Sequence, residues 1–137
     1  MNILLTGATG YIGKRLLLEL VRNGHHVVCC VRDKNRFNPP EAIKNNMEIL
    51  EIDFLHPPSK TTLPSDLDAA YYLMHSMSSA SNYEELELKV ADNFRKMVAS
   101  TLIKQVVYLS GIIKETALSK HLGSRKAVEH KLSQGSY

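Results

Sequence analysis

Short apolar runs alternate along this chain with stretches in which apolar residues recur at helical spacing. The alternation predicts a parallel, doubly wound α/β sheet with helical crossovers. The third run mixes apolar and polar residues, so we expect it at an edge of the sheet. The runs predict strands at residues 3–5, 27–31, 47–52 and 69–74, and a fifth strand with its turn at 106–111. The helical spacing predicts helices at 12–23, 83–100 and 121–129.

The first strand leads into a glycine-rich turn, TGATGYIG at residues 6–13, and then into the first helix. Such a turn suits a pyrophosphate, because glycines leave no Cβ in its way and the helix directs its free amides and positive dipole end at the phosphates. A P-loop is excluded, because Gly13-Lys14 is followed by Arg15, which has no hydroxyl for magnesium. The alternative is a tight strand-to-helix turn that binds nothing.

The motif TGATGYIG resembles the Thr-Gly-x-x-Gly-x-x-Gly signature of the extended and atypical short-chain dehydrogenase/reductases. The resemblance implies one Rossmann domain over residues 1–137, with strand order 3-2-1-4-5 and with NAD(H) or NADP(H) bound through the glycines. The segment YYLMHSM at residues 71–77 is similar to one in an atypical branch of NAD(P)H-binding proteins. The motif residues expected at the cofactor are Thr6, Gly7, Thr9, Gly10, Tyr11, Ile12 and Gly13.

The end of the second strand is expected to decide between the two cofactors. In dinucleotide folds this position, about twenty residues beyond the glycines, carries either an acid that binds the ribose of NAD or an arginine that accommodates the 2′-phosphate of NADP. Here Arg32 comes first and can also stack on the adenine, while Asp33 leaves NAD open. We therefore predict that NADP(H) is favoured over NAD(H). The alternative is a solvated surface pair without a ligand.

Residues after the third and fourth strands are expected to flank the same cofactor. Asp53-Phe54 resembles the family's acid-plus-apolar pair beside the adenine. His75 follows the fourth strand, at the carboxyl end where ligands of open α/β sheets bind. It is a candidate acid or base as well as a cofactor contact, with a plain loop histidine as the alternative. Asn93 stands at a place that resembles the family's asparagine in its fourth helix.

The resemblance also implies a serine after the fifth strand and a Tyr-x-x-x-Lys pair on the next helix. In the family the tyrosine transfers a proton, while the lysine lowers its pKa and holds the nicotinamide ribose. Ser110 fits the serine, but His121 takes the tyrosine position and Arg125 the lysine position. An imidazolium can donate a proton and an arginine can hold a ribose, yet arginine does not exchange protons at working pH. These three are the candidate catalytic residues, and the standard mechanism does not carry over unchanged.

Two functions follow from these residues. The first is the cofactor half of an NADPH-dependent oxidoreductase of unknown substrate. The second is a non-catalytic dinucleotide-binding redox sensor or assembly factor. A typical family member continues with a sixth strand and a substrate lobe, so we expect this chain to be the amino-terminal part of a longer protein.

The composition of the chain limits which partners and which cellular compartment we expect for the protein. With 137 residues, 44% of them hydrophobic, the chain can bury one moderate core. A net charge of +3 without a dense basic run argues against nucleic acid, and the apolar runs are far shorter than the ~18 residues of a membrane span. Cys29 and Cys30 are adjacent in a strand and lack metal-ligand spacing, which predicts a cytoplasmic protein without a metal site. A homo-oligomer is left open.

Overall fold

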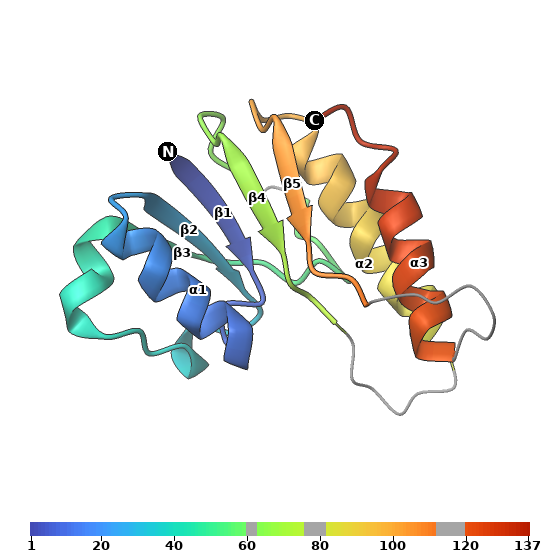
Figure 1. Ribbon diagram of the computed structural model, residues 1–137, viewed down its shortest axis with the longest axis horizontal. Helices are drawn as coiled ribbons and strands as arrows, with labels where there is room; N and C mark the ends of the chain where they lie inside the picture. Colours follow the sequence, from blue (N-terminus) through green and yellow to red (C-terminus); the bar gives the residue numbers. More distant parts are fainter. Residues whose placement is uncertain (60–62, 76–81, 112–119) are drawn as a thin grey trace.

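One parallel sheet organises the chain. The computed structural model describes residues 1–59, 63–75, 82–111 and 120–137. Its strands join in the order β3-β2-β1-β4-β5 with every pairing parallel, which confirms the predicted order and puts β3 at an edge (Figure 1). The strands are β1 (Asn2–Thr6), β2 (His26–Val31), β3 (Met47–Glu51), β4 (Ala69–Tyr72) and β5 (Gln105–Tyr108).

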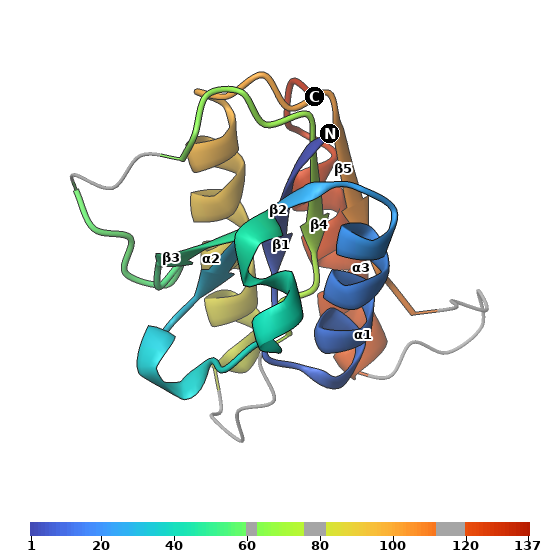
Figure 2. The same cartoon turned by 90° about the vertical axis from the view of Figure 1, so that its left-hand side faces the viewer.

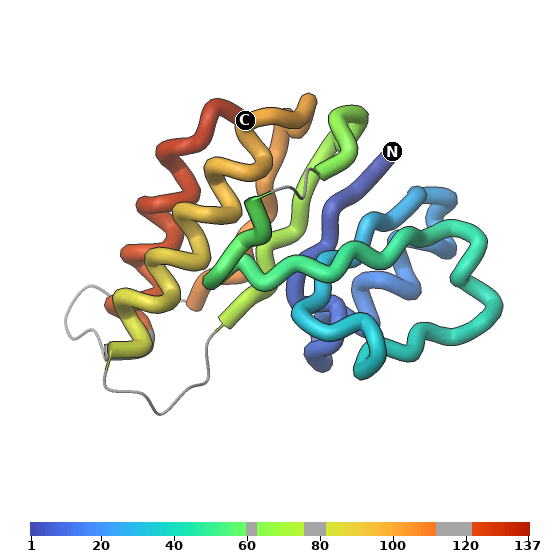
Figure 3. Tube along the Cα trace, turned by 180° about the vertical axis from the view of Figure 1, so that it is seen from behind, coloured from blue at the N-terminus to red at the C-terminus, as the bar shows by residue number. Residues whose placement is uncertain are grey.

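Helices cover both faces of the sheet. The helix α1 (Tyr11–Arg22) follows β1, and the short 3₁₀ helices η1 (Lys34–Arg36) and η2 (Glu41–Asn46) follow β2. The helices α2 (Tyr83–Val98) and α3 (Lys120–Leu132) lie side by side (Figure 3). Both pack on the face opposite α1, because their apolar residues join a different cluster from those of α1. Figure 2 shows α2 and α1 on opposite sides of the sheet. Among the helices of the described ranges, none has the length and apolar character needed to cross a membrane.

Successive side chains of β1 build two different apolar layers. Leu4 packs with Phe94 of α2 and Val128 of α3, whereas Leu5 packs with Leu17 of α1. The alternation follows from the geometry of a strand, whose neighbouring side chains point to opposite faces. Because both faces of the central strands are covered, their sequences read as continuous apolar runs rather than as alternating ones.

Aromatic rings tie α2 to the sheet. The buried ring of Phe94 lies 5.0 Å from that of Tyr72 and 5.6 Å from that of Phe54, measured between ring centroids. Tyr72 in turn lies 5.7 Å from the ring of Tyr108 on β5. Edge-on and tilted pairs of this kind add about 0.5–1.5 kcal/mol each to the gain from burial. The chain after β3 therefore shares one packing unit with β4, β5 and α2.

The first helix ends where the sequence predicts. Gly24 has a φ of +79°, which glycine adopts without a steric penalty. Its N–H donates to the carbonyl of Val21 (3.0 Å), and the N–H of His25 donates to that of Leu20 (3.1 Å). This pair of bonds is the Schellman arrangement, which satisfies carbonyls that the last turn would otherwise leave without donors.

A buried hydroxyl sets the end of β4. The strand stops at Tyr72, short of the predicted end at Met74. The fully buried side chain of Thr6 donates to the carbonyl of Tyr71 (3.1 Å) and accepts from the N–H of Leu73 (3.1 Å). The hydroxyl thus takes the place of a strand-to-strand bond and holds the chain that leaves β4 against the end of β1.

Thr6→Val keeps the shape of this side chain and removes its hydroxyl. Because the N–H of Leu73 then loses its acceptor, we expect the free energy of unfolding to fall by about 1–3 kcal/mol in urea denaturation. Amide hydrogen exchange at Leu73 should become faster. Thr6→Ser is the matched control, since it keeps the acceptor and should keep Leu73 protected. Equal exchange rates in the two variants would contradict this role for Thr6.

Candidate functional site

The turn between β1 and α1 is packed so closely that two of its glycines admit no side chain. Gly7 has a φ of +69°, and a Cβ there would lie 2.6 Å from the carbonyl oxygen of Leu73. A Cβ at Gly13 would lie 2.1 Å from the carbonyl oxygen of Gly7. Gly10 differs, because the nearest atom to a Cβ there is the Gly7 carbonyl oxygen at 3.3 Å. The first two glycines are required by the fold, and the third keeps the open side of the turn clear.

The amino end of α1 faces this open side. Gly10 is the residue that caps the helix, and no side chain accepts a hydrogen bond from the first amides there. The first turn also carries no acidic residue. The amides and the positive end of the helix dipole are therefore available to an anion placed over the turn.

A cavity of about 650 Å³ lies at the carboxyl ends of the central strands, next to this turn. The volume is within the usual range of ligand pockets, and the location is where open α/β sheets bind ligands. The remaining lining is mostly apolar and includes Cys30, Ile52 and, from α2, Val90. The cavity brings together these residues predicted as cofactor contacts: Gly7, Thr9, Gly10, Arg32, Asp53, Phe54 and His75.

Other residues predicted as cofactor contacts do not line this cavity. Thr6 is buried between strands, and Gly13 is buried in the first turn of α1, against the backbone of Gly7. The side chains of Tyr11 and Ile12 are 72% and 49% exposed. The guanidinium carbon of Arg15 lies over the ring of Tyr11, 3.7 Å from the ring centroid. A ligand over the turn would meet Tyr11 and Ile12 through their backbone amides.

Of the two charged residues after β2, Arg32 lies at the cavity, whereas the carboxylate of Asp33 is engaged in a hydrogen bond within its own loop. Arg32 is exposed at the cavity edge. Asp33 caps η1, because its carboxylate accepts from the N–H of Asn35 at 2.9 Å. The carboxylate of Glu51 accepts from the N–H of Lys34, also at 2.9 Å, and so fixes the loop to β3.

Asp53 and Phe54 form one wall of the cavity, and Asn93 holds that wall in place. The carboxylate of Asp53 accepts from the N–H of Leu55 at 3.0 Å and lies 3.3 Å from Nδ1 of His56. The side-chain amide of Asn93 donates to the carbonyl of Phe54 at 2.8 Å. Since Asn93 belongs to α2, this bond joins the wall after β3 to a helix that also lines the cavity.

His75 lies between the cavity and β5. It lines the cavity, and its ring centroid is 5.9 Å from that of Tyr108. Burial and the charge of Arg125 lower the pKa of His75, against the opposing effects of Glu87 and of a backbone hydrogen bond at Leu109. The neutral imidazole is therefore favoured relative to an exposed histidine.

Ser110 and Arg125 come together at the turn after β5. The hydroxyl oxygen of Ser110 is buried and has no hydrogen-bond partner. A Cβ at Gly111 would lie 3.4 Å from Nη1 of Arg125, so the guanidinium rests against this turn. Neither residue lines the cavity, whose nearest lining residue in this direction is His75. The backbone of His121 belongs to α3, and its side chain lies outside the described part of the structure.

Three polar residues near this turn are not among those that the sequence predicts. The hydroxyl of Tyr108 donates to the carbonyl of Arg125 at 3.4 Å, and burial raises the pKa of Tyr108 to about 12. Ser124 is 4% exposed, and its hydroxyl donates to the carboxylate of Glu87, which joins α3 to α2. A signal for Glu87 was present, because it precedes the buried Ala91 at helical spacing.

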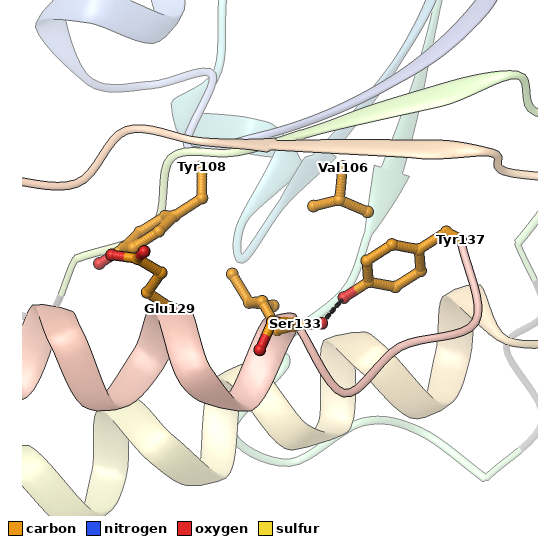
Figure 4. A pocket seen from close by; sticks show the side chains of 6 residues that line it. Val106, Tyr108, Glu129, Ser133 and Tyr137 are labelled. Carbon is orange, nitrogen blue, oxygen red and sulfur yellow. Dashed lines mark hydrogen bonds between the residues drawn. The ribbon is translucent and has the colours of Figure 1, made fainter.

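A second, smaller pocket lies between β5 and the carboxyl end of α3 (Figure 4). Its volume of about 170 Å³ is too small for a dinucleotide. The hydroxyl of Tyr137 closes one side by donating to the carbonyl of Leu132 at 2.5 Å. Glu129 is the charged residue of its lining, and the described residues contain no group of three side chains suited to a metal ion.

Comparison with known proteins identifies the family to which this sequence belongs. The model of the NAD dependent epimerase/dehydratase family matches residues 3–116. The auxiliary protein GraX of Staphylococcus aureus is 27% identical over 128 residues, which are 90% of this chain and 40% of that protein.

Solved structures give the same fold. The Citrobacter triphenylmethane reductase complexed with NADP(H) has a TM-score of 0.73 at 16% identity, covering 96% of this chain and 45% of that one. The UDP-glucuronic acid 4-epimerase of Bacillus cereus in complex with NAD has a TM-score of 0.70 at 21% identity, covering 96% and 50%. This chain thus spans about half the length of these relatives or less. Both the predicted Rossmann architecture and the resemblance carried by TGATGYIG are confirmed, and the chain belongs to the NAD dependent epimerase/dehydratase family.

Proposed function

We propose that this chain binds NADP(H) in preference to NAD(H) and forms the cofactor half of an NADPH-dependent oxidoreductase. The observation that carries the proposal is the cavity of about 650 Å³ that joins the glycine turn to Arg32 and to the Asp53-Phe54 wall. A nicotinamide dinucleotide needs such a combination of an anion-binding turn and an apolar slot. The family, and relatives solved with NAD or NADP(H), support the same cofactor class.

The residues present suit the parts of this cofactor. The clear side of Gly10 and the amides of α1 would take the pyrophosphate, and the wall at Asp53 and Phe54 would take the adenine. His75 would lie toward the nicotinamide end, with Ser110 beyond it. Bound NADPH would supply a hydride, and the chain's own part is to orient that end and to exclude water from it.

The state of the two residues after β2 supports NADP(H). The carboxylate of Asp33 already accepts a backbone hydrogen bond within η1, so it is less available to a ribose. Arg32 forms no ion pair with any described residue and stays exposed at the cavity. A free guanidinium next to an apolar slot suits a phosphate on the adenosine ribose.

The alternative is a dinucleotide-binding redox sensor or assembly factor without catalysis. It is favoured by His121 and Arg125, which stand where the resembling reductases have tyrosine and lysine. The absorbance of NADPH, followed against a panel of aldehydes, ketones and quinones, separates the two functions. Turnover that disappears in His121→Ala would support the oxidoreductase, and tight NADPH binding without turnover by the whole natural protein would support the sensor.

Gly10→Val is expected to abolish dinucleotide binding without unfolding the domain. The backbone at Gly10 is extended, at φ −77° and ψ 170°, which valine adopts, and a Cβ there needs only a small shift from the Gly7 carbonyl oxygen at 3.3 Å. The branched side chain would occupy the place of the pyrophosphate. Isothermal titration with NADPH measures the loss, and circular dichroism checks the fold. Gly123→Val is the control, because a Cβ there meets no atom within 4 Å. Undiminished binding in Gly10→Val would place the site elsewhere.

Arg32→Ala is expected to remove the preference for NADP(H). A charge-assisted contact with the 2′-phosphate contributes about 1.5–3 kcal/mol, which corresponds to a preference of roughly tenfold to a hundredfold. Affinity for NADH should change little. Arg22→Ala serves as the control, since Arg22 pairs with Glu19 at the far end of α1. Equal affinities of the unmodified chain for NADPH and NADH would assign the position to Asp33 instead.

A further inference from the structure

The guanidinium of Arg125 has no counter-ion at the turn after β5. Its side chain is partly buried, and it makes no ion pair or hydrogen bond with any residue in the described ranges. A guanidinium keeps its charge at every working pH, so neutralisation by proton loss is not available to it. Partial removal from water without a partner is unfavourable, and an anion would offset that cost.

Arg125 can lie against the turn after β5 because residue 111 is a glycine and has no side chain. A Cβ at this position would lie 2.7 Å from Cδ2 of Leu122 and 3.4 Å from Nη1 of Arg125. The first of these contacts is closer than real Cβ atoms tolerate, so α3 can lie against the turn only because residue 111 is glycine. The guanidinium is therefore held next to the backbone of residues 110–111.

A second unpartnered group stands at the same turn. The hydroxyl oxygen of Ser110 is buried and lacks any hydrogen-bond partner, which is rare for a buried polar atom and calls for an explanation. Ser110 precedes Gly111, so its unused donor and the unused guanidinium donors lie at one turn. The backbone of Leu109, directly before Ser110, acts on the pKa of His75, which lines the large cavity.

The acidic groups near this turn are engaged or directed elsewhere. The carboxylate of Glu87 accepts the hydroxyl of Ser124, and it acts electrostatically on both His75 and Tyr108. Glu129 faces Tyr108 from α3 and lines the smaller pocket (Figure 4). Neither forms an ion pair with Arg125 in the part of the chain that the structure describes.

We propose that Arg125 and Ser110 form a binding site for an oxyanion, the carboxylate or phosphate of a substrate or effector, with His75 as its neighbour on the cofactor side. The planar fork of a guanidinium binds such a group through two parallel hydrogen bonds, which an ammonium at this position cannot do. The placement beside the nicotinamide end rests on the proposed function. The oxyanion site itself rests on the residues of this turn.

The pKa of His75 can report whether an anion is bound at Arg125. The charge of Arg125 contributes to lowering the pKa of His75, so an anion bound to Arg125 should raise that pKa again. The pKa is measured by proton NMR on the whole chain, with the ring signal assigned through His75→Gln. The probes are inorganic phosphate and oxalate, each compared with chloride at equal ionic strength. Either probe is expected to shift the pKa of His75 upward, and the stronger one identifies the ligand as tetrahedral or planar.

Arg125→Gln should weaken probe binding roughly tenfold to a hundredfold, as loss of a charge-assisted contact implies. The same variant should raise the pKa of His75 in chloride alone. Arg125→Lys keeps the charge without the fork, so an intermediate affinity is expected. Lys126→Gln, at the exposed neighbouring residue, is the matched control and should bind the probes as the unmodified chain does.

Two results would overturn the oxyanion site. One is a pKa of His75 that neither probe moves, or that both move equally in Arg125→Gln. The other is a loss of NADPH affinity in Arg125→Gln together with unchanged probe binding, which would make Arg125 a contact of the cofactor ribose. Failure of the proposed function looks different, because the unmodified chain would then fail to bind NADPH while the probes still shifted His75 through Arg125.

Discussion

Contact between backbone atoms at the turn after β1 sets how β1, α1 and the chain that leaves β4 meet beside the large cavity. The carbonyl of Gly7 occupies the space of a Cβ at residue 13, and the carbonyl of Leu73 occupies that of a Cβ at residue 7. Side chains relieve an overlap by changing rotamer, but backbone carbonyls in a packed interior cannot. The start of α1, the end of β1 and the chain leaving β4 are consequently held as one unit, and Thr6 adds its two hydrogen bonds to the same junction.

The glycine turn at the large cavity and the turn after β5 are shaped by different kinds of group. Around the glycines, backbone atoms determine the shape, and Asn93 reinforces it by bonding to the backbone of Phe54. Around Ser110 and Arg125, side chains with hydroxyl groups and charge determine the chemistry. A substitution at the glycines would change the shape of the cavity, whereas a substitution at Ser110 or Arg125 would change the polar groups at the turn after β5.

Most of the fold could be predicted from the sequence because it depends on local patterns. Apolar runs locate the strands, and helical spacing together with Gly24 locates α1 and its end. The glycine turn, Arg32 and Asp53 could be placed at one edge of the sheet for the same reason, since each lies at or just after the end of a strand, and they line one cavity. The strand ends were predicted less well. β4 is shorter than its apolar run because a side chain from another strand takes over its next hydrogen bond.

The rest of the site depends on contacts between segments far apart in the sequence. The bond from Asn93 to Phe54 joins residues 39 positions apart, and the one from Ser124 to Glu87 joins residues 37 apart. No local pattern carries such a pairing. The engagement of Asp33 in capping η1 was also hidden, although an Asp that accepts from the backbone N–H two residues on is a common turn signal.

Tyr108 lies between the small pocket, which it lines, and the ring of His75. One side of its ring faces the small pocket of Figure 4, and the ring also packs on His75, at the edge of the large cavity. A single aromatic ring thus connects the small pocket beside α3 with His75, a lining residue of the large cavity. Repacking behind that ring, by a bulkier side chain at Val106 for example, would press on His75 from within the protein, so the histidine's position is coupled to core volume as well as to whatever binds in front of it.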